Sequence, residues 1–315
     1  MAYLPRMNVV AALVAAAQLS SAPASAQFVT TPDDSLRARI ERRIAEVPGA
    51  TVGFAFRDLA RTDTLYLRAD ERFHAASTMK VPVMIELFRR VDRKQLSLSQ
   101  RIELKNEFAS IVDGSPYTLS AADDSDSLVY RWIGTSVSVH DLLEHMITRS
   151  SNLATNTLIG LVDAKAANAT AHALGAKDIQ VLRGVEDNKA FAAGMNNTTT
   201  ARDLATLMAA IELDAAASKA STDSMRAILS RQEFNDEIPA GLPPGTRVAH
   251  KTGQITGHLH DAAIVYPMNR RPYVLVVLTR DIPDEKVAQS LIADISRLVF
   301  EHATARATAS AGTNQ

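Results

Sequence analysis

Strand-like patterns stand at both ends of this chain, and a long helical segment separates them. Between residues 77 and 232 the apolar residues recur mostly at helical spacing. Five short runs instead have the composition of strands: 51–56, 64–68, 247–252, 260–266 and 273–279. We therefore predict an α/β (α+β) fold in which both termini contribute strands to one sheet and the helical segment is inserted as a second lobe.

The first 26 residues have the pattern of a secretory signal peptide. Arg6 precedes an apolar run at 9–19, and small residues ending in Ala24-Ser25-Ala26 follow as a cleavage site. The alternatives are a buried N-terminal helix or a membrane anchor, but this apolar run is too short to cross ~30 Å of hydrocarbon. We expect cleavage after Ala26, no stable membrane anchor, and a periplasmic or secreted protein.

The remaining chain divides at the changes of pattern. A last amphipathic helix is expected at about 283–302, and the polar segment 106–131 is expected to be a loop beside the cleft between the lobes, where ligand sites are common. We predict these segments: a signal peptide at 1–26, a discontinuous α/β lobe at 27–72 and 236–304, a helical lobe at 73–235, and a disordered tail at 305–315.

Composition restricts the functions that such a fold could serve. The chain has 315 residues, of which 46% are hydrophobic and 22% charged, which is enough apolar material for a large core. Its formal net charge of -1 indicates no surface for nucleic acid, so we expect a small-molecule partner. The sequence leaves the oligomeric state open, with a monomer as the default expectation. The absence of cysteine excludes disulfides, thiolate metal sites and cysteine nucleophiles.

Ser77 and Lys80 form the first of three short motifs. Among the lysines, only Lys80 has a serine three residues before it. On a helix this spacing places the hydroxyl and the amine on one face, where an amine of lowered pKa could activate the serine as a nucleophile. The apolar residues 81–85 that follow favour a buried amine. The alternative is a helix-capping serine followed by a solvated lysine.

Two further motifs lie later in the chain. Ser150-x-Asn152 falls between helical segments, where its side chains could face a cleft or cap a helix. Lys251-Thr252-Gly253 lies in a predicted strand, where the lysine and hydroxyl could bind a carboxylate and the glycine would allow close backbone approach. The alternative for this third motif is a lysine that protects an edge strand.

The order Ser-x-x-Lys, Ser-x-Asn, Lys-Thr-Gly resembles that of the active-site serine penicillin-recognising enzymes, and most closely the class A serine β-lactamases. The resemblance runs over residues 35–302 and includes the Gly-Leu-Pro-Pro-Gly segment before Lys251. It also places Glu186 after Ser150 at the spacing where these enzymes carry a loop glutamate. It implies a β-lactamase/transpeptidase-like fold, with an antiparallel sheet flanked by helices and an inserted all-helical lobe.

The resemblance also implies a role for each motif residue. Ser77 would attack the lactam carbonyl, Lys80 would activate Ser77, and Ser150 would pass a proton to the departing nitrogen. Backbone N–H groups of Ser77 and Gln254 would form the oxyanion hole, and Glu186 would activate the hydrolytic water. No metal or cofactor is implied. Substrate contacts would come from Asn152, Lys251, Thr252, Gly253 and Gln254.

Three positions depart from the class A pattern. Ser151 stands where aspartate is usual, and Ala190 stands where an asparagine usually helps to hold the hydrolytic water. Asn197 stands where an aspartate usually pairs with an arginine, and Arg183 is one place out of step. We therefore describe the glutamate loop as atypical and expect deacylation to be the step most affected. The alternative for Glu186 is a solvated loop acid.

Other functions stay open at this point. A D-alanyl-D-alanine carboxypeptidase, an esterase or an amidase would use the same acylation chemistry as a β-lactam hydrolase. A non-turnover covalent sensor of β-lactams is a further hypothesis, which Ala190 favours. His258, His260 and Asp261 look like part of a zinc site, but the remaining histidines of metal-dependent lactamases are missing from the sequence, so we predict a structural role for them.

Overall fold

A five-stranded antiparallel sheet joins the two ends of the chain in the computed structural model, which describes residues 1–2, 35–61 and 63–311, with side chains to residue 305. The prediction of one sheet built from both termini is confirmed. Residues 3–26 of the predicted signal peptide lie outside the described residues. The strands follow the order β2 (Thr64–Leu67), β1 (Thr51–Asp58), β11 (Tyr273–Arg280), β10 (His258–Tyr266) and β9 (Arg247–Ile255).

Both faces of the sheet are buried. Along β11, Tyr273, Leu275 and Val277 belong to one core cluster, whereas Val274 and Val276 belong to the other. This alternation follows from the period of two in a strand, and β-branched residues suit a strand that packs on both sides. The sheet is therefore the middle layer of the molecule.

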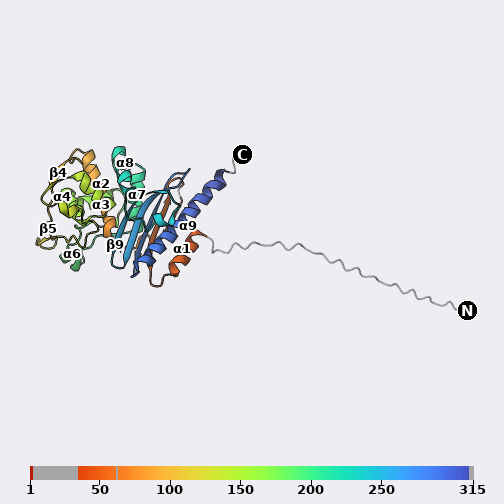
Figure 1. Cartoon of the computed structure of the whole chain (residues 1–315). Helices are drawn as coiled ribbons and strands as arrows, with labels where there is room; N and C mark the ends of the chain where they lie inside the picture. The colour runs from red at the N-terminus through yellow and green to blue at the C-terminus, as the bar shows by residue number, and fades with distance from the viewer. Residues whose placement is uncertain (3–34, 62, 312–315) are drawn as a thin grey trace.

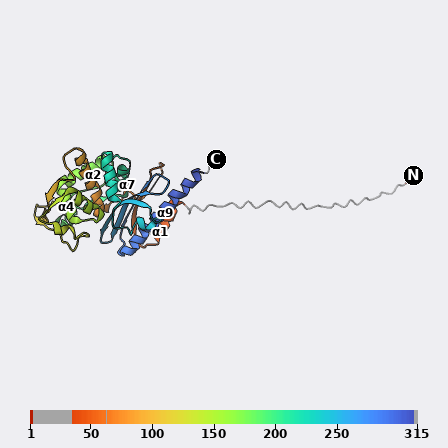
Figure 2. The same ribbon diagram turned by 45° about the horizontal axis from the view of Figure 1, so that its top comes forward.

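Helices cover each face of the sheet. α1 (Leu36–Ala45) and α9 (Glu285–Ala311) pack together on one face, and α7 (Ala201–Glu212) packs on the other (Figure 2). Two of these helices begin at side-chain caps, because Ser35 accepts the backbone N–H of Ala38 and Thr200 accepts that of Asp203. The spacing of Thr200 and Asp203 in the sequence is that of a capping box.

The last helix, α9, runs farther than its sequence pattern predicts. A helix end near residue 302 and disorder from residue 305 are expected, yet the helix continues to Ala311. Residues 303–311 contain only Ala, Thr, Arg and Ser, and no proline or glycine ends the helix before Gly312. Residues 305–311 of the predicted tail thus belong to α9, and residues 312–315 lie outside the described part of the chain.

A bundle of helices forms the rest of the molecule, beside the sheet (Figure 1). At its centre, nine consecutive residues of α2 from Lys80 to Phe88 are buried, which is typical of a helix surrounded by others. The helices of this lobe are α2 (Lys80–Asp92), α3 (Val139–Thr148), α4 (Asn152–Val162), α5 (Ala164–Ala173), α6 (Asn188–Ala192) and α8 (Lys219–Leu229).

Short elements connect these layers. Three pairs of short strands are β3 (Phe73–His74) with β8 (Thr198–Thr199), β4 (Arg101–Glu103) with β7 (Ser136–Ser138), and β5 (Phe108–Ala109) with β6 (Pro116–Tyr117). Three turns of 3-10 helix are η2 (Ala76–Met79), η3 (Val129–Trp132) and η4 (Pro239–Gly241). Among them, η2 contacts β9 and β10 and so links the bundle to the sheet.

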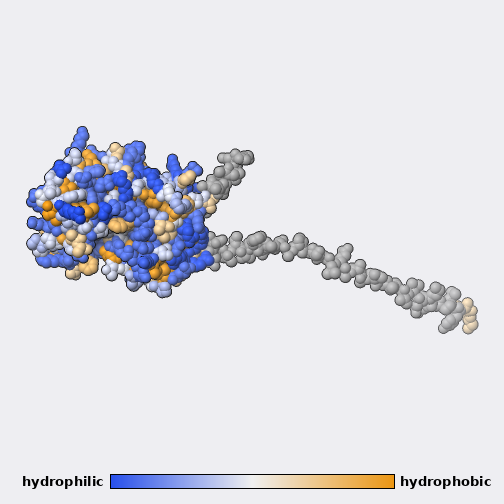
Figure 3. Space-filling model, viewed as in Figure 1, coloured by the Kyte–Doolittle hydropathy of each residue, from blue (hydrophilic) through white to orange (hydrophobic). Residues whose placement is uncertain are grey.

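The molecular surface in Figure 3 is mostly hydrophilic, with small separate apolar areas. α9 has 27 residues, but its Asp294, Arg297 and Glu301 form ion pairs on its outer side. In the part of the chain that the structure describes, no helix is long and apolar enough to cross a membrane.

Candidate active site

The three motifs meet where strand β9 passes the start of α2. Ser77 lies in η2, a single turn of 3-10 helix directly before α2. Its neighbour Ala76 has a left-handed backbone (φ 44°), and the Ala76 N–H donates to His74 Nδ1. A non-glycine residue in this region is strained, and such strain is common where a reactive side chain is held in place.

Gly253 allows β9 to approach this turn. A Cβ atom at Gly253 would lie 3.0 Å from Thr78 Cγ2 and 3.1 Å from the backbone nitrogen of Ser77. Those separations are shorter than ordinary van der Waals contacts, so a side chain would push the strand away from η2. The close backbone approach therefore requires glycine at this position.

Lys80 is fully buried and contacts residues of the first two motifs. Its Nζ lies 2.9 Å from Ser77 Oγ, 3.1 Å from Ser150 Oγ, 2.6 Å from the Ser150 carbonyl oxygen and 3.0 Å from Asn152 Oδ1. An ammonium group has only three N–H bonds for these four oxygens, so a neutral amine that accepts from one hydroxyl also fits the geometry. Burial, with the charge of Lys251, lowers the pKa of Lys80 well below its ordinary value.

Ser150 stands between two buried lysines. Its Oγ accepts from Lys251 Nζ at 3.0 Å, and Lys251 also donates to the Thr252 carbonyl at 2.9 Å. Burial lowers the pKa of Lys251 to about 7. Ser150 itself has a positive φ of 61°, so its backbone is strained in the same way as that of Ala76. The arrangement gives one hydroxyl two amines with which it can exchange a proton.

Asp124 holds the second motif in place from a distant part of the chain. Its Oδ2 accepts the backbone N–H groups of Asn152 at 2.8 Å and Leu153 at 3.0 Å, at the start of α4. Ser151 caps the same helix through the N–H of Ala154, and its hydroxyl lies 3.5 Å from Asp124. A buried carboxylate thus reaches the motif from the 106–131 segment, which was expected to border the cleft.

Glu186 faces the motifs from the loop before α6. Its Oε1 accepts from Asn152 Nδ2 at 2.7 Å, and Asn152 in turn accepts from Lys80. Burial raises the pKa of Glu186 above its ordinary value, and the Asn152 hydrogen bond partly offsets that shift. The residue is partly buried and bonded to Asn152, which argues against the alternative of a solvated loop acid.

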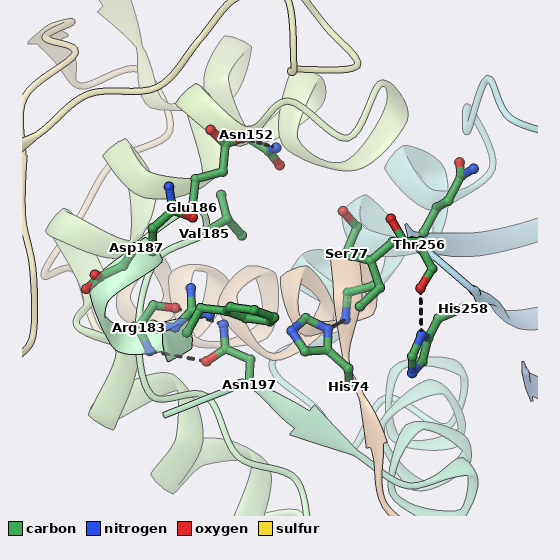
Figure 4. A pocket seen from close by; sticks show the side chains of 15 residues that line it. His74, Ser77, Asn152, Arg183, Val185, Glu186, Asp187, Asn197, Thr256 and His258 are labelled. Atoms are coloured by element: carbon green, nitrogen blue, oxygen red, sulfur yellow. Dashed lines mark hydrogen bonds between the residues drawn. The ribbon is translucent and has the colours of Figure 1, made fainter. Parts of the chain in front are cut away.

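Two cavities meet at Ser77. The larger, of about 460 Å³, lies toward Glu186, Phe191 and His258, and Figure 4 shows Ser77, Asn152 and Glu186 along it. The smaller, of about 350 Å³, lies toward Ser150 and Thr252. Ser77, Asn152 and Gln254 line both cavities. A ligand bound across this cleft would therefore place its reacting centre at Ser77.

Comparison with known proteins identifies this arrangement. A model of the β-lactamase enzyme family matches residues 35–303. The chain belongs to the β-lactamase family. A β-lactamase of Streptomyces fradiae is 27% identical over 95% of this chain and 97% of that enzyme, and β-lactamase AST-1 of Nocardia asteroides is 29% identical over 94% and 95%.

Solved structures agree with this β-lactamase-family assignment. An ancestral class A β-lactamase matches with a TM-score of 0.74 and 27% identity, over 85% of this chain and 100% of that one. A variant of PBP-A, solved as its acyl-enzyme with penicillin G, matches with a TM-score of 0.72 and 29% identity, over 85% and 95%. The chain is thus a class A β-lactamase-like serine hydrolase, as its motif order predicts.

The glutamate loop of this β-lactamase-family chain is closed by hydrogen bonds. Asn197 Oδ1 accepts the backbone N–H groups of Leu182 and Arg183, and Asn197 Nδ2 donates to the Arg183 carbonyl. The Arg183 guanidinium donates to backbone and side-chain oxygens of 184, 195 and 196. The Asn197 amide therefore fastens the base of the loop.

The far side of the loop is fastened by Asp187. Its carboxylate accepts from Ser110 Oγ and from the N–H groups of Ile111 and Ala190. Ala190 is fully buried, and its methyl group offers no hydrogen bond to a water molecule. Glu186 therefore lies in a loop that is fastened by hydrogen bonds, and Ala190, four residues further on, has no polar side chain.

The histidine and aspartate residues that resemble a zinc site form hydrogen bonds within the protein. His260 Nε2 lies 2.8 Å from the His74 carbonyl, and its Nδ1 lies 3.2 Å from the Thr279 nitrogen. Asp261 accepts from His250 Nδ1 at 3.0 Å. Among residues 35–61 and 63–305 no group of three or more His, Asp or Glu side chains is placed to hold a metal ion.

Two residues of the cleft are absent from the motif-based prediction. Asp124 lies in a polar segment with no distinctive spacing, and its role depends on contacts with residues 28 and 29 positions away. Glu237 lines the smaller cavity and is almost fully buried. No sequence motif includes Glu237, and its position in an acidic cavity wall is seen only in the folded structure.

Proposed function

We propose that this enzyme hydrolyses β-lactams through an acyl-enzyme on Ser77. The observation that carries the proposal is the 2.9 Å contact between Ser77 Oγ and Lys80 Nζ, where burial lowers the pKa of the amine. A neutral amine can accept the hydroxyl proton as Ser77 Oγ forms its bond to the lactam carbonyl carbon. The backbone N–H groups of Ser77 and Gln254 stabilise the negative oxygen, at about 2.7–4 kcal/mol per donor.

Ring opening then needs a proton at the lactam nitrogen. Ser150 donates its hydroxyl proton to that nitrogen as the C–N bond breaks, and the protonated Lys80 returns a proton to Ser150 across 3.1 Å. Lys251 and Thr252 hold the substrate carboxylate, with the Thr252 hydroxyl at the cavity wall and the charge of Lys251 behind it. Asn152 and Gly253 complete the substrate-binding wall.

Glu186 releases the product. It accepts a proton from a water molecule whose oxygen attacks the ester carbon, and Ser77 regains its proton as the ester C–O bond breaks. The raised pKa of Glu186 makes it a better proton acceptor than an ordinary carboxylate. Export to the periplasm or the exterior is also part of the proposal, supported by the signal-peptide pattern at 1–26.

A second candidate is a D-alanyl-D-alanine carboxypeptidase, an esterase or amidase, or a covalent β-lactam binder of the same fold. Ala190 favours it, because that buried methyl group cannot help to hold the hydrolytic water. The structural neighbour PBP-A, whose variant carries penicillin G as an acyl group, supports retention of an acyl-enzyme on a related fold.

A turnover assay separates the two candidates. Benzylpenicillin and a peptide ending in D-Ala-D-Ala are offered separately to the wild type and to Ser77→Ala. We expect many equivalents of benzylpenicillin to be opened by the wild type, and a loss of at least about 10³-fold in Ser77→Ala. Release of D-alanine, with only one equivalent of penicillin consumed, would instead establish the second candidate.

A further inference from the structure

The wall of the smaller cavity is acidic. Four carboxyl side chains line it, and no lysine, arginine or histidine does so among the described residues. Lys251 approaches from behind the wall, where it is fully buried and donates to Ser150 and Thr252. The four carboxyl groups are those of Asp123, Asp236, Glu237 and Glu285.

Glu237 is the one member of this wall that is buried, with 4% of its surface exposed. Its Oε2 is inaccessible and has no hydrogen-bond partner among the described residues. A buried acceptor without a partner is unfavourable, so a rotation of the Glu237 side chain that brings Oε2 to a donor on a ligand in the cavity would be favourable. Burial, with the nearby charges of Asp261 and Asp236, raises the pKa of Glu237 to about 8, and a positive ligand charge would favour its ionised form.

Phe234 adds a second feature suited to a cation. Its side chain lines the same cavity as the four carboxyl groups, and the residue is 38% exposed. An aromatic face beside carboxylates is the usual surroundings of a bound ammonium group. A neutral group would gain less from these neighbours, and an anion beside the carboxyl groups, away from Lys251 and Thr252, would be repelled by them.

We propose that Asp236, Glu237 and Glu285 form a subsite for a positively charged group that the substrate carries on the side of its lactam nitrogen. This inference rests on the proposed function, because Ser150 and Thr252 define which side of the substrate enters the cavity. The preferred substrate is thus zwitterionic, with its carboxylate at Thr252 and its ammonium group at the acidic wall.

A matched pair of ligands tests the subsite. Two cephalosporins share one acyl side chain and differ in whether the C3 substituent carries a quaternary ammonium group. Their dissociation constants are measured by calorimetry with the Ser77→Ala variant, which cannot be acylated at that position. We expect the cationic compound to bind at least about tenfold more tightly, and the difference to shrink at high salt.

Variants locate the effect. In the same Ser77→Ala background, the pair Asp236→Asn and Glu285→Gln should bring the preference below about threefold, and Glu237→Gln should reduce it as well. Glu233→Gln is the matched control, because this substitution removes one negative charge from the same segment of the chain. Glu233 lies outside the cavity lining and forms an ion pair with Arg149. That control should keep the full preference.

The outcomes separate this inference from the proposed function. Equal binding of the two compounds, or a preference that survives Asp236→Asn with Glu285→Gln, would overturn the cation subsite even if the wild type hydrolyses both. Tighter binding of the cationic compound, without any acylation of the wild type, would support the subsite and overturn the proposed function. Failure of both compounds to bind would overturn both.

Discussion

At the scale of single residues, the site depends on burial that changes the protonation of two amines and one carboxyl group. Lys80 and Lys251 are fully buried within hydrogen-bond distance of the Ser150 hydroxyl. Glu186 is linked to Lys80 through the Asn152 amide. Burial therefore lowers the pKa of both amines and raises the pKa of the carboxyl group, and each shift favours proton transfer at the active site.

Lys80→Met tests the proposed base. Methionine keeps much of the volume but cannot accept a proton, so we expect acylation by benzylpenicillin to slow by about 10²–10⁴-fold. In the wild type, acylation should also slow as the pH is lowered, because protonation of Lys80 removes the acceptor. Stopped-flow acylation rates over a pH series measure both effects, and a Lys80→Met rate equal to wild type would exclude Lys80 as the base.

Glu186→Gln separates deacylation from acylation. We expect acylation to stay within a few-fold of wild type and deacylation to fall by about 10²–10⁴-fold, so that the acyl-enzyme accumulates. In the wild type the deacylation rate should begin to fall at a higher pH than an ordinary carboxylate would cause, since burial raises the pKa of Glu186. Single-turnover measurements give both rates, and unchanged deacylation in Glu186→Gln would remove this residue from the mechanism.

At the scale of elements, the position of the second motif is set by the start of α4. Asp124 supplies a carboxylate to two backbone N–H groups there, and Ser151 supplies the cap. Charge-assisted hydrogen bonds of this kind contribute about 1.5–3 kcal/mol each. An aspartate outside the motif therefore fixes the backbone at the start of α4.

Asp124→Ala should lower kcat for benzylpenicillin by at least about tenfold, because Asn152 and Lys80 lose their alignment. The compensating variant Ser151→Asp, combined with Asp124→Ala, restores a carboxylate at the same helix start and should recover most of that loss. Kinetics of the single and double variants make the comparison. A double variant no better than Asp124→Ala would show that Asp124 acts in another way.

Gly253→Ala should displace β9 from η2. The added Cβ would lie 3.0 Å from Thr78 Cγ2 and 3.1 Å from the Ser77 nitrogen, so the strand must shift. We expect a loss of at least tenfold in kcat/KM with an unfolding temperature within a few degrees of wild type, because the clash is confined to the site. Gly160→Ala is the control, since that glycine has open space around it.

The parts of this account that sequence could predict are the local ones. The periodicity of the strands, the cap at Thr200 and the order of the three motifs are properties of short segments. The contacts of Asp124 and Glu237 depend on how distant segments pack, so no spacing reveals them. The continuation of α9 beyond residue 302 is not predicted by the terminal position of this segment, which favours disorder, whereas its alanine-rich composition favours helix.

At the scale of the whole molecule, the site lies where the helical bundle meets a sheet made from both ends of the chain. That junction buries ionisable groups that would be solvated in either part alone. Burying Glu237 therefore links the stability of the fold to pH.

The free energy of unfolding should show this link. Between about pH 4.5 and 8, Glu237 is protonated in the folded state and ionised in the unfolded state, so its contribution falls as the pH rises, on the order of 1 kcal/mol per pH unit at most. Relative to wild type, Glu237→Gln should gain stability over that range and show no further gain above it. Urea unfolding at several pH values tests this, and a pH-independent difference would contradict it.

Hydrolysis requires that Ser77 is acylated and that the acyl group is then released. Mass spectrometry of the protein mixed with benzylpenicillin, followed over time beside Ser77→Ala, observes both steps. We predict a transient mass increase equal to one penicillin, absent in Ser77→Ala and lost as the opened product accumulates. An adduct that persists would contradict hydrolysis, and the absence of any adduct with unconsumed penicillin would contradict the assignment of Ser77 as the nucleophile.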